Sequence, residues 1–227
     1  MNLLVLGRGK TGSLVNDVAL ERKHQVRMLG AAENRNSAAL TPECLHDVDV
    51  VIDFTTPAAV ILNMEACAQS GKSMVVGTTG WYDELDRVRH IVQQSGIGFV
   101  YGANFSFGVN LFFEIAKVAA EALQHGYGGS VEEVHHVHKK DSPSGTALKL
   151  QQLLQQSSGK RLGIASIREG DVPGTHTISL ESESDCLTLT HEAKSRRGFA
   201  EGAVKAAEWL NGKTGFYEFR EIFHEVG

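Results

Sequence analysis

The sequence predicts an α/β fold: a Rossmann-like domain with a parallel sheet, into which a second, α+β domain is inserted. Three observations lead to this expectation. Over the first hundred residues, short apolar runs alternate with amphipathic segments, as in successive strand–helix–strand units. A glycine-rich turn directly follows the first apolar run. After Gly102 the pattern changes to a long apolar helix and then to alternating strands, before a helical pattern returns near the C-terminus.

In the first domain, each expected element follows from its local pattern. Apolar runs bounded by turn residues predict strands at 3–6, 25–29, 48–54, 73–76 and 97–101. Helical spacing of apolar residues predicts helices at 12–22, 57–69 and 81–94, and Pro57 suits the first turn of the second of these. A helix between successive strands is the usual connection of a parallel pair, so we expect a parallel sheet.

The inserted domain should begin after a hinge at 102–106. Its expected elements are helices at 109–123 and about 144–156, and strands at 130–137, 176–182 and 186–191. A final helix at 199–210 ends near Gly212 and should return to the first domain. We therefore expect a discontinuous first domain, 1–106 and 197–227, and an inserted second domain, 107–196.

Composition narrows the class of protein. The 227 residues, 42% of them hydrophobic, can bury a core, and a formal charge of −5 without a long basic run argues against nucleic acid as the main partner. Three scattered cysteines fit neither a disulfide framework nor a four-thiolate zinc site. No targeting signal and no apolar stretch of membrane-spanning length is recognised. We expect a cytoplasmic metabolic protein without a membrane partner.

The first glycine turn is a candidate dinucleotide site. It has the form G-x-G-x-x-G between a strand and a helix, where glycines let a pyrophosphate approach the backbone and the helix N-terminus faces it. Glu33 lies 21 residues after the last glycine, where an acid would meet a ribose hydroxyl, whereas Arg8 and Arg35 could face a 2′-phosphate. A turn that only connects strand to helix is the alternative. The motif residues are Gly7, Arg8, Gly9, Lys10, Thr11 and Gly12.

Polar residues also follow later strands of this domain. Asp53-Phe54-Thr55 and Gly77-Thr78-Thr79-Gly80 each come after an apolar run, and open α/β sheets bind ligands at the carboxyl ends of their strands. These segments are candidates for the nicotinamide half of the site. Helix capping and turn formation would explain them equally well, and the same holds for Asn104.

The strongest chemical signal is a cluster of histidines. It runs His135-His136-Val137-His138-Lys139 and continues to Ser144-Gly145-Thr146. Imidazoles titrate near neutral pH, and a Ser-Gly-Thr turn could begin a helix whose amides face a carboxylate. Strand alternation would place His135 and Lys139 on one face, so His136 could join His135 on one ligand only after a bend. Histidines that satisfy one another or bind a metal, and a purely capping Ser144, are the alternatives.

This cluster closely resembles a known signature. The run from Glu133 to Ala147 is similar to that of the dihydrodipicolinate reductase family, now called 4-hydroxy-tetrahydrodipicolinate reductases, of the diaminopimelate route to lysine. The likeness continues at 51–55, 76–80, 103–110 and 199–203, in order along most of the chain. The first loop is shorter than the family's G-x-x-G-x-x-G, and the stretches at 33–48 and 159–177 are abbreviated.

The resemblance implies an NADH- or NADPH-dependent reduction of a small cyclic dicarboxylate by a homotetramer. The first domain, 1–106 and 197–227, would then be the dinucleotide-binding domain, and 107–196 the substrate-binding and oligomerisation domain. It implies that His135 handles the proton and Lys139 donates it, with His136, Ser144, Gly145 and Thr146 holding the substrate, and no metal. The implied cofactor contacts include Gly7 to Gly12, Gly77, Thr78, Thr79, Gly102, Ala103, Asn104 and Phe105. Two alternatives are reduction of another cyclic imine or dicarboxylate, and a dinucleotide-sensing module without turnover; the histidine–lysine signature disfavours the sensor.

Overall fold

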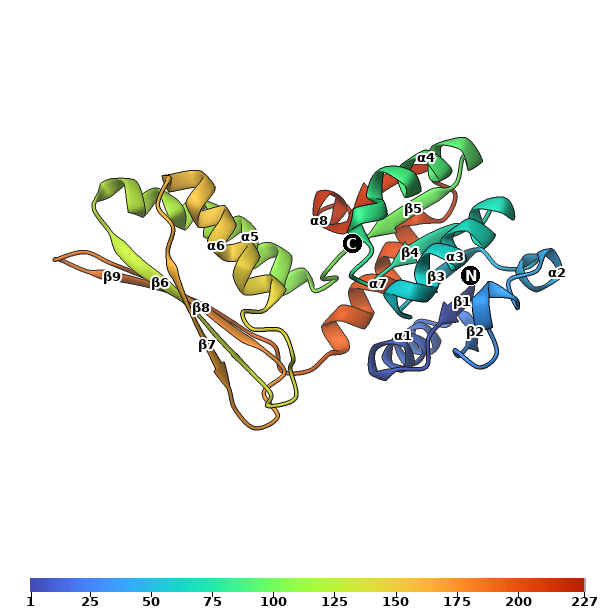
Figure 1. Ribbon diagram of the computed structural model, residues 1–227, viewed down its shortest axis with the longest axis horizontal. Helices are drawn as coiled ribbons and strands as arrows, with labels where there is room; N and C mark the ends of the chain where they lie inside the picture. Colours follow the sequence, from blue (N-terminus) through green and yellow to red (C-terminus); the bar gives the residue numbers. More distant parts are fainter. Residues whose placement is uncertain (227) are drawn as a thin grey trace. The chain divides into compact units, whose positions relative to one another are not determined.

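The computed structural model describes residues 1–226, which divide into two compact units (Figure 1). Unit 1 comprises Met1–Phe107 and the chain from Arg197 onward, and unit 2 comprises Gly108–Arg196. The predicted fold class is confirmed: unit 1 carries a parallel sheet and unit 2 a mixed one. Among the helices of residues 1–226, none has the length and apolar character needed to cross a membrane.

Unit 1 is built on a six-stranded sheet in the order β10-β5-β4-β3-β1-β2, with every pair parallel. The chain moves outward from β1 in both directions, so the strand order reverses beside β1, where open α/β sheets bind ligands. The strands are β1 (Asn2–Leu6), β2 (Gln25–Leu29), β3 (Val50–Asp53), β4 (Ser73–Val76), β5 (Gly98–Tyr101) and β10 (Gly215–Glu218).

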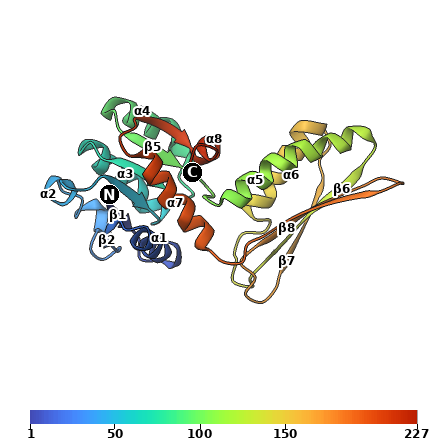
Figure 2. The same cartoon turned by 180° about the vertical axis from the view of Figure 1, so that it is seen from behind.

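Helices cover both faces of this sheet, as the two views show (Figures 1 and 2). Helices α1 (Lys10–Glu21) and α7 (Arg197–Leu210) pack together on one face, and α3 (Pro57–Gln69) and α4 (Leu85–Ser95) lie on the other. Because strand side chains alternate, Val5 and Ile52 enter the first core while Leu4 and Val51 enter the second. The short elements are α2 (Pro42–Leu45), α8 (Phe219–Ile222) and the 3₁₀ turns η1 (Arg35–Ser37) and η2 (Tyr82–Glu84).

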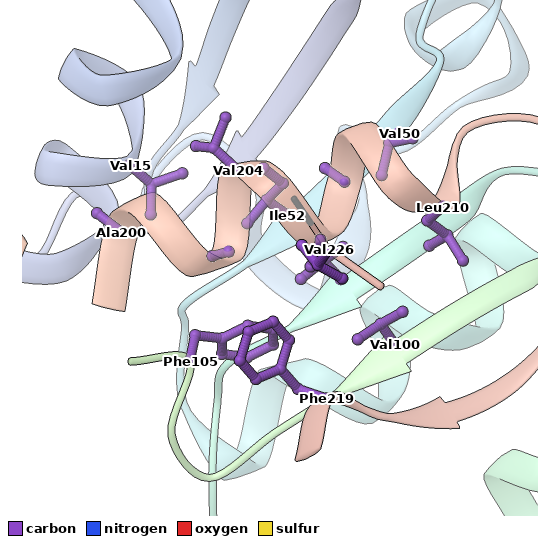
Figure 3. Close-up of a cluster of buried hydrophobic side chains, with 14 of the residues drawn as sticks. Val15, Val50, Ile52, Val100, Phe105, Ala200, Val204, Leu210, Phe219 and Val226 are labelled. Carbon is purple, nitrogen blue, oxygen red and sulfur yellow. The ribbon is translucent and has the colours of Figure 1, made fainter. Parts of the chain in front are cut away.

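The core beneath α7 joins the two separated parts of unit 1. Figure 3 shows Ala200, Val204 and Leu210 of α7 close to side chains of the sheet, with Phe105 and Phe219 beside them. The rings of Phe105 and Phe219 have centroids 4.7 Å apart, and both side chains are almost fully buried. The C-terminal segment thus completes a core begun by the first hundred residues.

Unit 2 is a four-stranded sheet covered on one face by two helices. Its order is β7-β6-β8-β9, with β6 and β7 parallel and the other pairs antiparallel. Apolar residues of α5 and α6, including Phe112, Ala116 and Leu150, pack on Val131 and Ile178 of the sheet. The elements are α5 (Phe107–Ala119), the 3₁₀ segment η3 (Ala120–His125), β6 (Gly128–His135), α6 (Gly145–Ser158), β7 (Gly163–Arg168), β8 (Thr175–Glu181) and β9 (Cys186–Glu192).

Three differences from the sequence expectations have local causes. The sequence did not predict β7 or β10, which are short strands at sheet edges with little apolar alternation. The helix expected at 109–123 becomes a 3₁₀ segment after Ala119 and ends at Gly126, which has a left-handed φ of 93°. The strand expected at 130–137 ends at His135, which changes the interpretation of the histidine cluster.

Candidate active site

The turn after β1 requires glycine at two of its motif positions. Gly7 has a φ of +102°, a conformation that side chains disfavour. A Cβ at Gly12 would lie 2.0 Å from the carbonyl oxygen of Gly7, so α1 can approach β1 this closely only with glycine there. The sequence motif therefore produces the tight strand-to-helix turn that we expected.

The middle glycine of the motif lies beside open space. Gly9 is the N-cap of α1, and no atom lies within 4 Å of the place where its Cβ would be. Within the described residues, no side chain caps this helix end, and its first turn holds no acidic residue. The amides of Lys10 and Thr11 therefore lie at an uncapped, positively polarised helix end. This arrangement fits the pyrophosphate of a dinucleotide.

Glu33 and Arg8 contact each other at the end of β2. Nη2 of Arg8 lies 2.9 Å from Oε1 of Glu33, and Oε2 of Glu33 accepts a 2.7 Å hydrogen bond from the Gly30 amide. The carboxylate is thus anchored, and the guanidinium beside it partly balances its charge. Arg35 lies exposed in η1, two residues further on. An acid of the kind that could meet a ribose and cations of the kind that could meet a phosphate therefore lie at this corner of unit 1.

A buried carboxylate organises the next strand end. Asp53 accepts hydrogen bonds from the hydroxyls of Thr55 and Thr78 and from the Asn63 amide, at 2.7, 2.8 and 2.8 Å. Burial raises the pKa of Asp53, while these hydrogen bonds lower it. Asn63 in turn accepts a hydrogen bond from Asn34, the residue after Glu33. Asp53 and Thr78 therefore hold the loops in place, and no sequence pattern pointed to the two asparagines.

The remaining predicted cofactor residues lie at the ends of β4 and β5. Thr79 and Ala103 are exposed, and Gly77 and Gly102 directly follow the strands. Asn104 accepts a hydrogen bond from the Ser106 amide, as expected of a turn residue. The ring of Phe105 lies in the core, so only its backbone could face a ligand.

In unit 2, His135 ends β6 and faces a buried carboxylate. Its Nδ1 lies 2.5 Å from Oε2 of Glu133, two residues earlier on the same face of the strand. The two groups are in ion-pair contact, although not in well-aligned hydrogen-bond geometry. Both side chains are buried, at 9% and 0% exposed. Burial lowers the pKa of His135, and the charge of Glu133 acts in the opposite direction.

The other oxygen of Glu133 binds two groups. Oε1 accepts hydrogen bonds from Nη2 of Arg168, at 2.9 Å, and from the amide of Ser144, at 3.2 Å. Burial alone would raise the pKa of Glu133, but the hydrogen bonds from Arg168 and Ser144, and the charge of His135, lower it to about 2. Glu133 is therefore ionised at neutral pH although its side chain is fully buried.

The backbone leaves the sheet immediately after His135. The amides of His136 and Val137 bond to the carbonyls of Val172 and Gly170, and the amide of Lys139 bonds to the carbonyl of His136 in a turn. The expectation that His136 and His138 take the strand face opposite His135 and Lys139 is therefore wrong, because strand alternation stops at His135. The bend that a ligand shared by His135 and His136 requires does occur here.

Residues 136–144 form a loop rich in positive charge, defined here as the histidine loop. Nζ of Lys139 lies 2.8 Å from Oδ1 of Asp141. Burial raises the pKa of Asp141, but the hydrogen bond and the charge of this ammonium outweigh burial, so the pKa is lowered overall. Nε2 of His136 lies 3.2 Å from Nη2 of Arg196. The loop thus carries Lys139 and His136 with a second cation, Arg196, beside them.

The histidine loop ends at the N-terminus of α6. Ser144 is the N-cap, and its buried hydroxyl accepts a hydrogen bond from the Ala147 amide at 3.2 Å. The same hydroxyl lies 3.1 Å from Nε2 of His176 on β8. Gly145 is exposed and Thr146 half-buried at the first two helical positions, where amides lack intrahelical acceptors. Gly145 and Thr146 can meet an anion, whereas the Ser144 hydroxyl is occupied by the cap.

His176 completes the buried cluster. Its ring meets that of His135 edge to face, with centroids 5.0 Å apart. Burial, together with a smaller effect of the charge of His135, lowers the pKa of His176 to about 4. Glu133, His135 and His176 each offer one ligand atom within 4.8 Å of the others, a spacing that a metal ion could bridge. The guanidinium of Arg168 on the same carboxylate disfavours a second cation and favours a proton network.

Comparison with known proteins agrees with this arrangement. The N-terminal model of the dihydrodipicolinate reductase family matches residues 1–105, and its C-terminal model matches residues 108–223. The chain belongs to the dihydrodipicolinate reductase family. A relative from Christiangramia forsetii, a 4-hydroxy-tetrahydrodipicolinate reductase, is 38% identical over 100% of this chain and 99% of its own. One of the same name from Neisseria meningitidis is 37% identical over 77% of this chain and 72% of its own.

Solved structures share the fold. Dipicolinate-bound dihydrodipicolinate reductase from Paenisporosarcina sp. TG-14 superposes with a TM-score of 0.80 over 98% of this chain and 99% of that one, at 23% identity. Aspartate dehydrogenase from Thermotoga maritima has a TM-score of 0.52 at 11% identity, over 94% of this chain and 97% of that one. The fold therefore extends beyond the family, and family membership rests on the sequence matches.

The resemblance read from the sequence is thus confirmed at the level of the family. The structure adds residues that sequence patterns did not indicate: Arg168, His176 and Arg196. All three come from beyond α6 and reach the histidine cluster only through the folding of unit 2. A lone Arg or His carries no recognisable spacing in the sequence, so this assembly could be found only in three dimensions.

Proposed function

We propose that this protein is a 4-hydroxy-tetrahydrodipicolinate reductase that uses NADH or NADPH in diaminopimelate and lysine biosynthesis. The observation that carries the proposal is the match of both family models, with a relative of that name aligned along the whole chain. The uncapped helix end in unit 1 and the histidine cluster in unit 2 support it with chemistry that a reductase needs.

We assign cofactor binding to unit 1. The amides at the start of α1, beside the empty space at Gly9, would hold the pyrophosphate, and Glu33 would meet the adenosine ribose. Arg8 lies next to Glu33 and could turn to a 2′-phosphate, which supports use of both cofactors. Reduced nicotinamide, when bound, supplies the hydride. Asp53 and Thr78 keep the neighbouring loops in place.

We assign substrate binding and proton handling to unit 2. His135 would exchange a proton through Nε2, since Nδ1 faces Glu133, and Lys139 would supply a proton and positive charge. The first amides of α6, at Gly145 and Thr146, would bind one carboxylate of a small dicarboxylate. His136 beside Arg196 would bind the other, and Ser144 would set the position of the helix rather than touch the substrate.

We further propose a cytoplasmic homotetramer. One face of the unit 2 sheet is covered by α5 and α6, and the other carries side chains such as Thr177, Ser179 and Ile167. A sheet face left without a helical layer suits pairing with another copy of the chain, and closed symmetric assembly is the usual form. Unit 2 would then mediate oligomerisation as well as substrate binding.

A coupled assay tests the proposed reaction. Purified protein is mixed with NADH or NADPH and with substrate freshly generated by dihydrodipicolinate synthase, and the absorbance of the reduced nicotinamide is followed. We expect oxidation that depends on the synthase. His135→Ala and Lys139→Ala should each lower kcat by about 10²-fold or more, the scale of a lost acid or base.

Two neighbours serve as matched controls. His138→Ala and Lys140→Ala change exposed residues of the same loop and should retain near-wild-type turnover. Cofactor binding without synthase-dependent oxidation would instead indicate a dinucleotide sensor. Wild-type kcat in both His135→Ala and Lys139→Ala would refute the assignment of these residues.

A further inference from the structure

The most demanding feature of unit 2 is the buried negative charge of Glu133. Its side chain is 0% exposed, yet its pKa of about 2 keeps it ionised at neutral pH. Burying an ion is costly unless partners surround it, and replacing such a group by apolar packing is often no less stable. The carboxylate contacts three groups: the His135 imidazole, the Arg168 guanidinium and the Ser144 amide. Stability alone does not explain its presence.

The contact with His135 fixes the position of a proton. With Nδ1 only 2.5 Å from a carboxylate oxygen, an unprotonated Nδ1 would place its lone pair close to a negative charge. The proton of neutral His135 therefore belongs on Nδ1, and Nε2 becomes the atom that exchanges protons. Glycine at position 174 keeps one side of Nε2 clear, because a Cβ there would lie 2.9 Å from it.

The contact with Arg168 reaches the histidine loop. Nη2 of Arg168 lies 2.9 Å from Oε1 of Glu133 and also donates a 2.7 Å hydrogen bond to the carbonyl of Asp141. The side chain of Asp141 in turn binds Nζ of Lys139 at 2.8 Å. Oε1 of Glu133 also holds the Ser144 amide, at the other end of the loop. One carboxylate thus anchors the segment that carries Lys139.

We propose that Glu133 is the positioning residue of this site: one oxygen holds the proton of His135 on Nδ1, and the other, through Arg168, holds the loop that carries Lys139. The proposal rests on the proposed function, because it assumes that His135 and Lys139 handle the proton. Glu133 touches neither substrate nor cofactor in this arrangement. It acts by orienting the groups that do, as the carboxylate partners of catalytic histidines commonly act.

The test compares Glu133→Gln with Glu132→Gln, which removes a charge from the exposed neighbour on the same strand. Glu133→Gln should lower kcat at least about 10-fold, within the range that a positioned acid or base contributes. The KM for the nicotinamide should not change, because Glu133 lies in unit 2. Glu133→Asp keeps the charge and should recover part of kcat. Glu132→Gln should match wild type in each measurement.

Nuclear magnetic resonance of the His135 ring nitrogens gives a readout that does not depend on activity. The charged groups around His135 are Glu133, Arg168 and Lys139, with the ring of His176 beside it. In wild type we expect the proton on Nδ1. In Glu133→Gln the pKa of His135 should fall, because the one anion that raises it has been removed.

Removing one partner of a buried ion pair can prevent folding, so a charge-balanced variant completes the test. Glu133→Gln/Arg168→Gln removes both charges, and His135 should then no longer hold its proton on Nδ1 alone. A fixed Nδ1 proton in both variants, or an unchanged kcat in Glu133→Gln, would overturn the proposal. Wild-type kcat in His135→Ala would instead overturn the role assigned to His135, and the nitrogen spectra would still report whether Glu133 orients the ring.

Discussion

Acid should destabilise unit 2 through His176, because protonation would place a charge on a buried ring. Only 5% of the residue is exposed, and its Nε2 lies 3.1 Å from the Ser144 hydroxyl. Burial lowers its pKa from 6.5 to about 4. As the pH falls below 6.5, His176 becomes protonated in the unfolded chain, whereas in the folded chain it stays neutral until about pH 4. The folded state therefore loses stability as the pH falls from 6.5 to about 4. The stabilisation that comes from neutral His176 is fully present only above this range.

The size of the effect follows from the two pKa values. A pKa lowered from 6.5 to about 4 corresponds at most to about 3 kcal/mol of unfolding free energy. Most of the change falls between pH 7 and pH 5, where His176 alone should remove about 2 kcal/mol. Burial also lowers the pKa of His135 and of His191, so these residues act in the same direction.

The assay is urea unfolding at pH 7 and pH 5 for wild type and His176→Gln, with hydrogen exchange of β8 as a local probe of unit 2. Glutamine can still reach the Ser144 hydroxyl but does not titrate. The variant should lose about 2 kcal/mol less than wild type between the two pH values. His125→Gln, an exposed site in the same unit, is the control and should behave as wild type. Equal pH dependence in wild type and His176→Gln would refute this reasoning.

Three further predictions concern binding and assembly. Thr146→Val should raise the KM for the dicarboxylate far more than that for the nicotinamide, because the change is confined to the start of α6; a parallel rise in both would make this turn a structural cap only. Steady-state kinetics with NADH and NADPH should give kcat/KM values within about a hundredfold, since Glu33 and Arg8 lie side by side; a much larger preference would show that one of them does not reach the ribose. Light scattering at micromolar concentration should report about four times the 24.6 kDa chain mass, and the monomer mass would contradict the homotetramer.

The fold of unit 1 was largely predictable because its signals are local. The strands β1 to β5 were each recognised as a short, mostly apolar run, and Gly7 and Gly12 occupy positions that only glycine tolerates. The elements that escaped prediction depend on partners distant in sequence. β10 is a four-residue strand whose residues are all only half-buried, and it exists because it pairs with β5, more than a hundred residues earlier.

The candidate site was likewise predictable only where its signals are local. The sequence picked out His135 and Lys139 from their spacing and from the family resemblance. It could not show that Glu133 is buried, because a charged residue on a half-polar strand is usually exposed. Nor could it show that Arg168 supplies the matching charge, because the two meet only through the parallel pairing of β6 with β7, which was not predicted.

The end of β6 at His135 explains why strand alternation failed where the chemistry begins. Pairing with β7 stops at the pair His135–Arg168, so the next residues are free to turn. If the strand had continued, Lys139 would stand four residues along the sheet from His135, about 13 Å away, at the usual rise of a strand. Ending the strand allows the histidine loop to fold back, and the hydrogen bond from Arg168 to the Asp141 carbonyl holds it there. The buried ion pair of Glu133 with Arg168 and the end of the strand at His135 are therefore two parts of one arrangement, which under the proposed function would let an imidazole and an ammonium meet a common ligand.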